Sequence, residues 1–441
     1  MKKTLLFALL ALILPIVADA FDFESDGIYY NINNNKTSVS VTYFSNSYSG
    51  SVVIPPIVTY DSNTYSVSKI GRNAFRNCSS LTSVTIPSSV TVIGIDAFAG
   101  CTGLTSVTIP NSVTSIEDGA FNGCVGLTDA IIPHTVTNIG NRAFLGCSGL
   151  KEVPFSKGLK NIDGEAFYGC SSLKSIIIPS SVENIGDRAF SNCPNLESIF
   201  VDKDNKYFDS RNFCSAIIKK GFDTPDVLIV GCKNTVIPIS AWFIGDYAFE
   251  GCSGLTTIIF PDSVGYIGDY AFSGCTGLTR VFFPLGTSHI GSYAFNNCTN
   301  LSFIDIPSRI VSICDYAFSE CPRLKFVSCA ATKVPDTANE AFYESNPESA
   351  TLFVPENVVN DYKSTFPWSL FGTILPIEES SYILGDANGN GEVEIGDVTS
   401  VLTLMATPEA PGYDTKAADA NKNGVIEIGD VTTILTIMAG A

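Results

Sequence analysis

Apolar residues recur along the chain at fixed positions of a repeat that is 23 residues long. The repeat from Cys78 to Gly100 reads CSSLTSVTIPSSVTVIGIDAFAG, and the next reads CTGLTSVTIPNSVTSIEDGAFNG. The cysteine that opens each repeat marks two runs of the chain: Cys78, Cys101, Cys124, Cys147, Cys170 and Cys193, then Cys252, Cys275, Cys298 and Cys321. A fixed period of this length is the signature of a solenoid, in which each repeat stacks on its neighbours.

Each repeat predicts one short strand followed by a compact turn. Val84 and Ile86 alternate with polar residues, which is the period of a half-buried strand, and Pro87 ends it because proline cannot donate to a strand ladder. The remainder is too short for a long helix, so we expect a turn and one helical or 3-10 turn that carries Phe98 into the core. A single repeat has no core of its own. We therefore predict a repeat solenoid with one parallel β-sheet and irregular or 3-10 backs.

The recurring patterns L-x-x-V-x-I-P and I-G-x-x-A-F-x-x-C resemble the BspA-like family of leucine-rich repeats. Ten repeats carry them, over about two thirds of the chain. The resemblance implies a bacterial surface or secreted protein that binds other macromolecules, since members of the family have been linked to host matrix and cell attachment.

Residues 1–20 have the pattern of a secretory signal peptide. Two lysines precede an apolar stretch from Leu5 to Val17, and an A-D-A site predicts cleavage after Ala20. We find no other apolar run of membrane-spanning length in the sequence. The expected location is outside the cell, secreted or on the surface of a bacterium.

The segments around the repeats predict caps. Strand-like alternation in residues 21–68 predicts an N-terminal β cap, which a solenoid needs to shield its open core. We assign residues 69–350 to the repeats, with a hairpin insertion near residues 202–236, and residues 351–380 to a C-terminal cap and linker. In that cap, Trp368 and Phe371 are expected to cover the last repeat.

The last sixty residues carry a duplicated loop with calcium-ligand spacing. Calcium takes six to eight hard oxygen ligands, and a glycine at position six allows the sharp turn of such a loop. Position seven would contribute its backbone carbonyl. The candidate ligands of the first loop are Asp386, Asn388, Asn390, Glu392, Glu394 and Asp397, and those of the second are Asp419, Asn421, Asn423, Val425, Glu427 and Asp430. Two such loops predict two calcium ions.

Residues 381–441 resemble a type I dockerin, a small all-α module with two calcium loops, each followed by a short helix. Asp at position twelve of both loops matches that family. The resemblance implies docking onto a cohesin, often in polysaccharide-degrading assemblies. Ile395-Gly396 and Ile428-Gly429 occupy the recognition positions, where the better-known members carry polar residues. A calcium-stiffened module without a partner is the alternative.

Fourteen cysteines in an exported chain would normally suggest disulfides. Ten of them recur at one core-facing position, where a small and weakly polar side chain fits, so we expect reduced, structural thiols there. Cys214 with Cys232, or Cys314 with Cys329, could pair. One thiol per repeat offers no cluster of four ligands for zinc.

The net charge and the scarcity of catalytic groups argue against several classes of function. A formal net charge of −18 argues against nucleic acid or anionic lipid as the main partner. The two histidines, His134 and His289, lie in loops about six repeats apart, and no nucleophile or phosphate-loop motif occurs. We therefore expect a protein that is not an enzyme.

The open face of the sheet is the candidate ligand face. If Val84 and Ile86 point into the core, residues 83 and 85 point out, and the same slots can be followed through every repeat. The first repeats carry Ser and Thr there, whereas later ones carry the candidate ligand residues Phe200, Ile259, Arg280, Phe282, Phe303, Asp305 and Phe326. Exposed apolar side chains on such a face are typical of an interface, with aromatic and Arg anchors. The alternative is that a cap or the hairpin covers these rings.

Two functions remain open on the sequence. In the first, an exported adhesion or binding protein holds a protein or glycan ligand on its sheet and is tethered by its tail. In the second, the solenoid is a spacer in an extracellular complex that the tail assembles.

Overall fold

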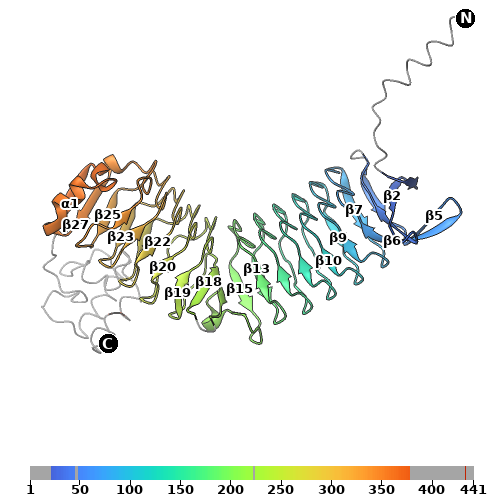
Figure 1. Ribbon diagram of the computed structural model, residues 1–441, viewed down its shortest axis with the longest axis horizontal. Coiled ribbons are helices and arrows are strands. Elements are labelled where there is room, and N and C mark those ends of the chain that lie inside the picture. The colour runs from blue at the N-terminus through green and yellow to red at the C-terminus, as the bar shows by residue number, and fades with distance from the viewer. Residues whose placement is uncertain (1–20, 45–47, 222–223, 378–432, 434–441) are drawn as a thin grey trace, which may run out of the picture. The chain divides into compact units, whose positions relative to one another are not determined.

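The computed structural model describes residues 21–44, 48–221, 224–377 and 433 (Figure 1). The chain divides into two compact units, Met1–Gly254 and Leu255–Ala441, called unit 1 and unit 2 below. Both are built from stacked repeats of short parallel strands, which confirms the predicted solenoid.

Unit 1 begins with a small β-structure. The strands are β1 (Phe23–Ser25), β2 (Ile28–Ile32), β3 (Ser38–Val41), β5 (Ile57–Tyr60) and β6 (Asn63–Ile70). The first three form an antiparallel meander, and β3 then pairs in parallel with β6. Because β6 also pairs in parallel with the first repeat strand of its ladder, this structure covers the open end of the solenoid core.

Two strand ladders run along the repeats of unit 1. The first ladder is formed by the two-residue strands that precede the turn of each repeat, and it is called the turn-side ladder below. It consists of β8 (Val92–Ile93), β10 (Ser115–Ile116), β11 (Asn138–Ile139), β12 (Asn161–Ile162) and β14 (Asn184–Ile185). The ladder on the sheet face is formed by β4 (Gly50–Val53), β7 (Leu81–Thr85) and β9 (Ser106–Thr108), and farther along by β13 (Ser175–Ile178) and β15 (Ser198–Val201). Partners lie one 23-residue repeat apart, as Ile116 opposite Ile93 shows.

The predicted hairpin insertion follows β15. It contains β16 (Phe208–Asp209), the 3-10 turn η1 (Arg211–Phe213), β17 (Ile217–Lys219) and β18 (Asp226–Val230). β17 pairs antiparallel with β18, and β18 pairs in parallel with β19 (Ala241–Ile244). In Figure 1 the hairpin strand β18 lies between β15 and β19.

Unit 2 repeats the same plan. Its turn-side ladder is β20 (Tyr266–Ile267), β22 (His289–Ile290), β24 (Ser312–Ile313) and β26 (Asp336–Thr337). Its sheet face is β21 (Arg280–Phe282), β23 (Phe303–Ile306), β25 (Phe326–Cys329), β27 (Thr351–Val354) and β28 (Thr373–Pro376). The remaining elements are η2 (Pro347–Ser349), η3 (Glu356–Val358), α1 (Val359–Ser364) and η4 (Trp368–Leu370).

The last repeat is closed by the aromatic residues that the sequence singles out. Trp368 is fully buried, packs edge-on against the ring of Phe342 and donates from its indole nitrogen to Thr337 Oγ1 at 3.1 Å. Phe371 packs on the same ring. These contacts confirm that Trp368 and Phe371 cover the end of the array.

The backs of the repeats are successive tight turns, without a regular helix among the described repeats. Ala97 N donates to Gly94 O at 3.1 Å and Cys101 N to Phe98 O at 3.1 Å, which are bonds of the 3-10 type. Asp96, between them, has φ +53°, and this left-handed residue stops the turns from merging into a helix. The same position holds Gly119 in the next repeat, where glycine adopts φ +63° without steric cost.

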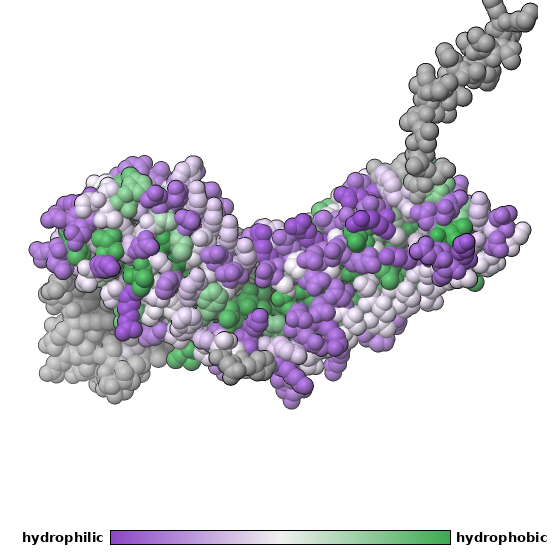
Figure 2. Space-filling model, viewed as in Figure 1, coloured by the Kyte–Doolittle hydropathy of each residue, from purple (hydrophilic) through white to green (hydrophobic). Residues whose placement is uncertain are grey.

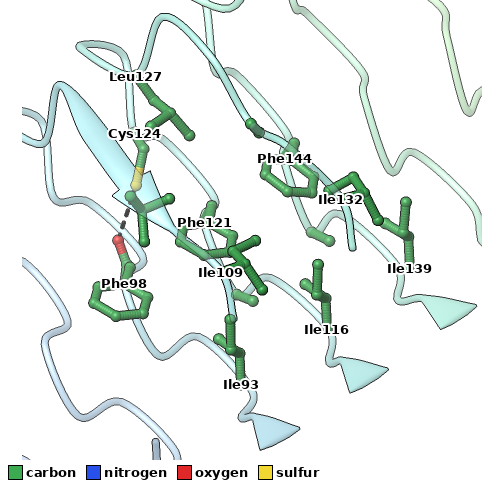
Figure 3. Close-up of a cluster of buried hydrophobic side chains, with 14 of the residues drawn as sticks. Ile93, Phe98, Ile109, Ile116, Phe121, Cys124, Leu127, Ile132, Ile139 and Phe144 are labelled. Atoms are coloured by element: carbon green, nitrogen blue, oxygen red, sulfur yellow. Dashed lines mark hydrogen bonds between the residues drawn. The ribbon is translucent and has the colours of Figure 1, made fainter. Parts of the chain in front are cut away.

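The core consists of columns of identical side chains. The rings of Phe75, Phe98, Phe121, Phe144 and Phe167 stack with centroids 4.9 to 5.2 Å apart. Figure 3 shows Phe98, Phe121 and Phe144 of this column. Isoleucines one repeat apart form a second column: Ile93, Ile116, Ile139 and Ile162, all fully buried. Repetition of the sequence thus becomes repetition in space, because each apolar slot meets its own copy.

Candidate functional site

The sheet face displays the side chains that the alternation predicts. In β7 Val84 is buried and Thr85 is exposed, and Ile86, directly after the strand, is buried again. In β13 the pattern is sharper, since Ile176 and Ile178 are buried and Ile177 is 64% exposed. The outward slots of the repeats are therefore those expected from the sequence.

An apolar patch with two charged residues lies on the sheet face of unit 2. The strand register places Arg280, Phe303 and Phe326 in one outward row. A second row runs beside it, from Phe282 through Asp305 and Ser328 to Phe353 and Leu375. We call the following residues the unit 2 patch: Arg280, Phe282, Phe303, Asp305, Phe326, Phe353 and Leu375.

The rings of this patch contact one another and remain open to solvent. The centroids of Phe282 and Phe303 are 5.3 Å apart, and those of Phe326 and Phe353 are 6.3 Å apart. Phe326 and Leu375 are exposed, and Phe282 and Phe303 are partly exposed. Beneath them, Val281, Ile304 and Val327 are fully buried, so the outward rings stand on rigid strands.

Phe353 and Leu375 belong to this patch although the candidate ligand face predicted from the sequence did not include them. The repeat pattern decays after Cys321, so β27 and β28 read as cap segments. The sequence nevertheless contains the pattern of a repeat strand here, because Leu352 and Val354 occupy the core-facing positions on either side of Phe353 and Pro355 follows them.

A second apolar set lies on the sheet face of unit 1. Ile131, Ile177 and Phe200 occupy the same outward slot in their repeats and are exposed, and β13 and β15 place Ile177 opposite Phe200. Pro154 fills the slot between Ile131 and Ile177 and is also exposed. In Figure 2 apolar side chains gather over β13 and β15.

The predicted ligand residues therefore divide between the two units. Phe200 is in unit 1, and five others are in the unit 2 patch. Ile259 precedes Phe282 by one repeat and is 61% exposed, but the strand segment of its repeat, residues 255–260, forms no strand in the structure.

The hairpin covers part of one ring of the sheet face, because Phe213 of η1 packs edge-on against Phe200 with ring centroids 6.3 Å apart. Both rings nevertheless stay exposed.

The twelve predicted calcium ligands, from Asp386 to Asp430, lie outside the described residues. Within the described ranges, no three His, Cys, Asp or Glu side chains come together as a metal site. The donor set itself fits calcium, because carboxylates and amide carbonyls supply the hard oxygens that this ion prefers.

The cysteine column has a hydrogen-bonding role. In most repeats the thiol donates to the carbonyl of a phenylalanine 26 residues earlier, as Cys147 does to Phe121 O at 3.1 Å. Figure 3 shows the equivalent bond from Cys124 to Phe98 O, which is also 3.1 Å long. Burial raises the pKa of the Cys147 thiol to about 12, so the thiol stays protonated and can donate. All fourteen cysteines fall in the described part of the chain, and all are free, including the two pairs that the sequence left open.

The repeats match a known family. The model of the BspA type leucine rich repeat region, in six copies, matches residues 68–197, 114–225 and 232–369. Together these ranges cover more than half of the chain. The chain belongs to the BspA-type leucine-rich repeat family. A second model, that of the dockerin type I domain, matches residues 384–435 of this BspA-type protein. The comparison with curated proteins finds no match.

Solved structures agree with this assignment. A leucine rich cell surface protein from Faecalibacterium prausnitzii is 28% identical, with a TM-score of 0.60, over 81% of this chain and 95% of its own. The pneumococcal vaccine antigen PcpA is 19% identical, with a TM-score of 0.62, over 81% of this chain and 98% of its own. The likeness to PcpA shows the fold alone.

These matches determine the general class of this BspA-type protein. Leucine-rich repeats and dockerins are non-catalytic binding modules, which supports a protein-binding function at the cell surface or docked into a complex. Dockerins generally bind calcium and imply a cohesin partner. Among the described residues, no helix is long and apolar enough to cross a membrane.

Proposed function

We propose that this is an exported adhesion protein that captures a macromolecular ligand on the unit 2 patch and is docked by its C-terminal module in calcium. The observation that carries the proposal is the patch itself, in which four phenylalanines and one arginine face outward on adjacent strands. Aromatic and Arg side chains are the residues that most often dominate binding energy at interfaces.

The patch is suited to capture because it is ordered before a ligand arrives. Its rings already contact one another, and their strands are fixed by buried neighbours such as Ile304 and Val327. Ligand binding would therefore cost little side-chain entropy. Outward-facing aromatic rings can contact an apolar protein surface or the faces of sugar rings, so protein and glycan ligands are both tested below.

The C-terminal module would hold two calcium ions through its Asp and Asn side chains, with Glu392 and Val425 giving backbone carbonyls. Calcium would order each loop and the helix that follows it, which is the form that docks. A cohesin-like domain is the proposed partner. The second candidate function, a spacer in a polysaccharide-degrading complex, uses the same tail but needs no ligand on the patch.

A double substitution in the patch separates the two functions. We would measure binding of the full-length protein to immobilised extracellular-matrix proteins, mucin and polysaccharides, and compare it with the Phe282→Ser, Phe303→Ser variant. The expected result is at least a tenfold loss of binding to whichever probe the unaltered protein captures. The matched control is Thr351→Ser, Thr373→Ser, which alters outward polar residues of the same sheet.

Binding that survives the double substitution would remove the patch from the proposal. If the unaltered protein captures none of the probes, the spacer function is favoured instead. Retained docking of the double variant through its tail would show that only the ligand face had been changed.

A further inference from the structure

The turn-side ladder of unit 1 is interrupted after β14. In earlier repeats the backbone of each turn donates to the next one, as Phe144 N does to Ala166 O at 2.8 Å and Phe167 N to Ala189 O at 2.8 Å. Arg142 N and Glu165 N donate in the same way, to Gly164 O and Asp187 O. Arg188 and Phe190 are the next residues in these two series, and in the described structure their N–H groups have no acceptor.

The hairpin is the cause of this interruption. Gly231 N donates at 2.7 Å to Ala248 O, the acceptor that the repeat pattern would give to Phe190. Likewise Gly245 N donates to Leu228 O at 2.8 Å, whereas the equivalent Gly186 N donates to Ile162 of the preceding repeat. The repeat at 245–248 therefore pairs with the hairpin, and β14 remains an edge strand.

A groove of about 200 Å³ separates the two sides. One wall is formed by Ile185, Arg188 and Phe190, and the other by Val227 and Ile229 of β18. Ile185 is only partly buried, whereas its counterparts in the column, such as Ile139 and Ile162, are fully buried. The core of unit 1 thus opens to solvent in this groove.

The walls of the groove are held in place just beyond its end. Asn192 N donates to Glu250 O at 2.8 Å, which restores the regular bond between successive turns. The Arg188 guanidinium donates to the Glu250 carboxylate through Nε at 2.8 Å and also through its terminal nitrogen. Its central carbon lies 5.0 Å from the ring centre of Tyr247. These contacts fix the spacing of the two walls at this end of the groove.

We propose that this groove binds an extended peptide segment of a partner protein, which lies along β14 and the turn that follows it. The N–H groups of Arg188 and Phe190 would donate to carbonyls of the peptide, and one of its apolar side chains would fill the space between Ile185, Val227 and Ile229. Strand addition to an open sheet edge is a common mode of peptide recognition, in which main-chain bonds give affinity and an adjacent pocket gives specificity. None of these residues belongs to the unit 2 patch, so the site is additional to the proposed ligand face.

The experiment uses the full-length protein and a displayed library of random heptapeptides. Peptides would be selected on the unaltered protein after depletion on Val227→Trp, a variant whose indole fills the groove, and the enriched sequences synthesised. Expected results are at least tenfold weaker binding to Val227→Trp and slower amide hydrogen exchange at Arg188 and Phe190 on binding. Ile229→Lys is the second variant, in case Val227→Trp fails to fold. Val125→Trp, at an exposed position of unit 1, is the matched control.

Three results would overturn the proposal. The library could yield no sequence that distinguishes the unaltered protein from both groove variants. Selected peptides could bind without slowing exchange at Arg188 and Phe190. In the free protein these two amides could also exchange as slowly as those of Phe144 and Phe167, which would mean that the groove is closed in solution. The Phe282→Ser, Phe303→Ser variant should bind the peptides normally, so the two sites are tested separately.

Discussion

At the scale of single residues, the cysteines show how one side chain serves the whole array. Buried thiols such as those of Cys124 and Cys147 donate a second hydrogen bond to a phenylalanine carbonyl that already accepts one from a backbone N–H. The decayed repeat supports this role, since Ser345 occupies the cysteine slot and its hydroxyl donates to Phe318 O at 2.5 Å. The slot therefore selects a small side chain that donates a hydrogen bond.

Substitution at Cys147 tests that role. Cys147→Ala should lower the free energy of unfolding by about 1–3 kcal/mol, because Phe121 O loses the second of its two donors and the missing sulfur leaves a small cavity in the core. Cys147→Ser should lower it less, because a hydroxyl can still donate. Urea unfolding of both variants, followed by tyrosine fluorescence and circular dichroism, measures the difference. Equal losses would mean that packing alone explains the cysteine.

At the scale of elements, each repeat is a strand and a turn that have stability only through their neighbours. The phenylalanine column joins the turns, with ring centroids 5.1 Å and 5.2 Å from Phe144 to Phe121 and Phe167. Main-chain bonds between successive turns run beside it. Loss of one ring therefore weakens two interfaces between repeats at once, as expected in a solenoid.

Phe144→Ala should destabilise unit 1 by about 3–5 kcal/mol, since it leaves a cavity between two stacked rings. The control is Phe213→Ala, which removes a ring that is 81% exposed and should change stability by about 0.5 kcal/mol or less. Thermal unfolding of the two variants gives the comparison. A small effect of Phe144→Ala would show that the column can repack around the missing ring.

At the scale of the whole molecule, the chain joins an array of repeats to a module of different chemistry. The array matches the BspA-type model to residue 369, and the dockerin match begins at residue 384. Calcium is expected to act on the second part only, because its donor loops lie between Asp386 and Asp430.

Calcium should slow amide hydrogen exchange of the full-length protein in residues 384–435 and leave residues 21–377 unchanged. EDTA should reverse the effect, because loops rich in Asp lose their counter-charge without the ion. The double variant Asp386→Ala, Asp419→Ala should exchange rapidly in calcium, and Asp262→Ala, an exposed acid in the array, is the control. Exchange that is indifferent to calcium would contradict both predicted ion sites.

The sequence by itself determined the repeat and its orientation. A period of 23 residues with invariable apolar slots allows one stacking register, since a shift by a single residue would turn Val84 and Ile86 outward. The same pleat placed Phe282, Phe303 and Phe326 on the open face. Local alternation was sufficient to predict both sets of residues, because alternate side chains of one strand point into the core and out to the open face.

Only the tertiary structure decided which distant segments meet. Phe353 and Leu375 join the patch because β27 and β28 extend the sheet of unit 2, although the repeat pattern has decayed there. The thiol-to-carbonyl bond depends on the distance between neighbouring repeats, and the groove at β14 exists because Gly231 takes the acceptor of Phe190. In each case the outcome depends on groups that lie far apart in the chain and meet only when the repeats stack.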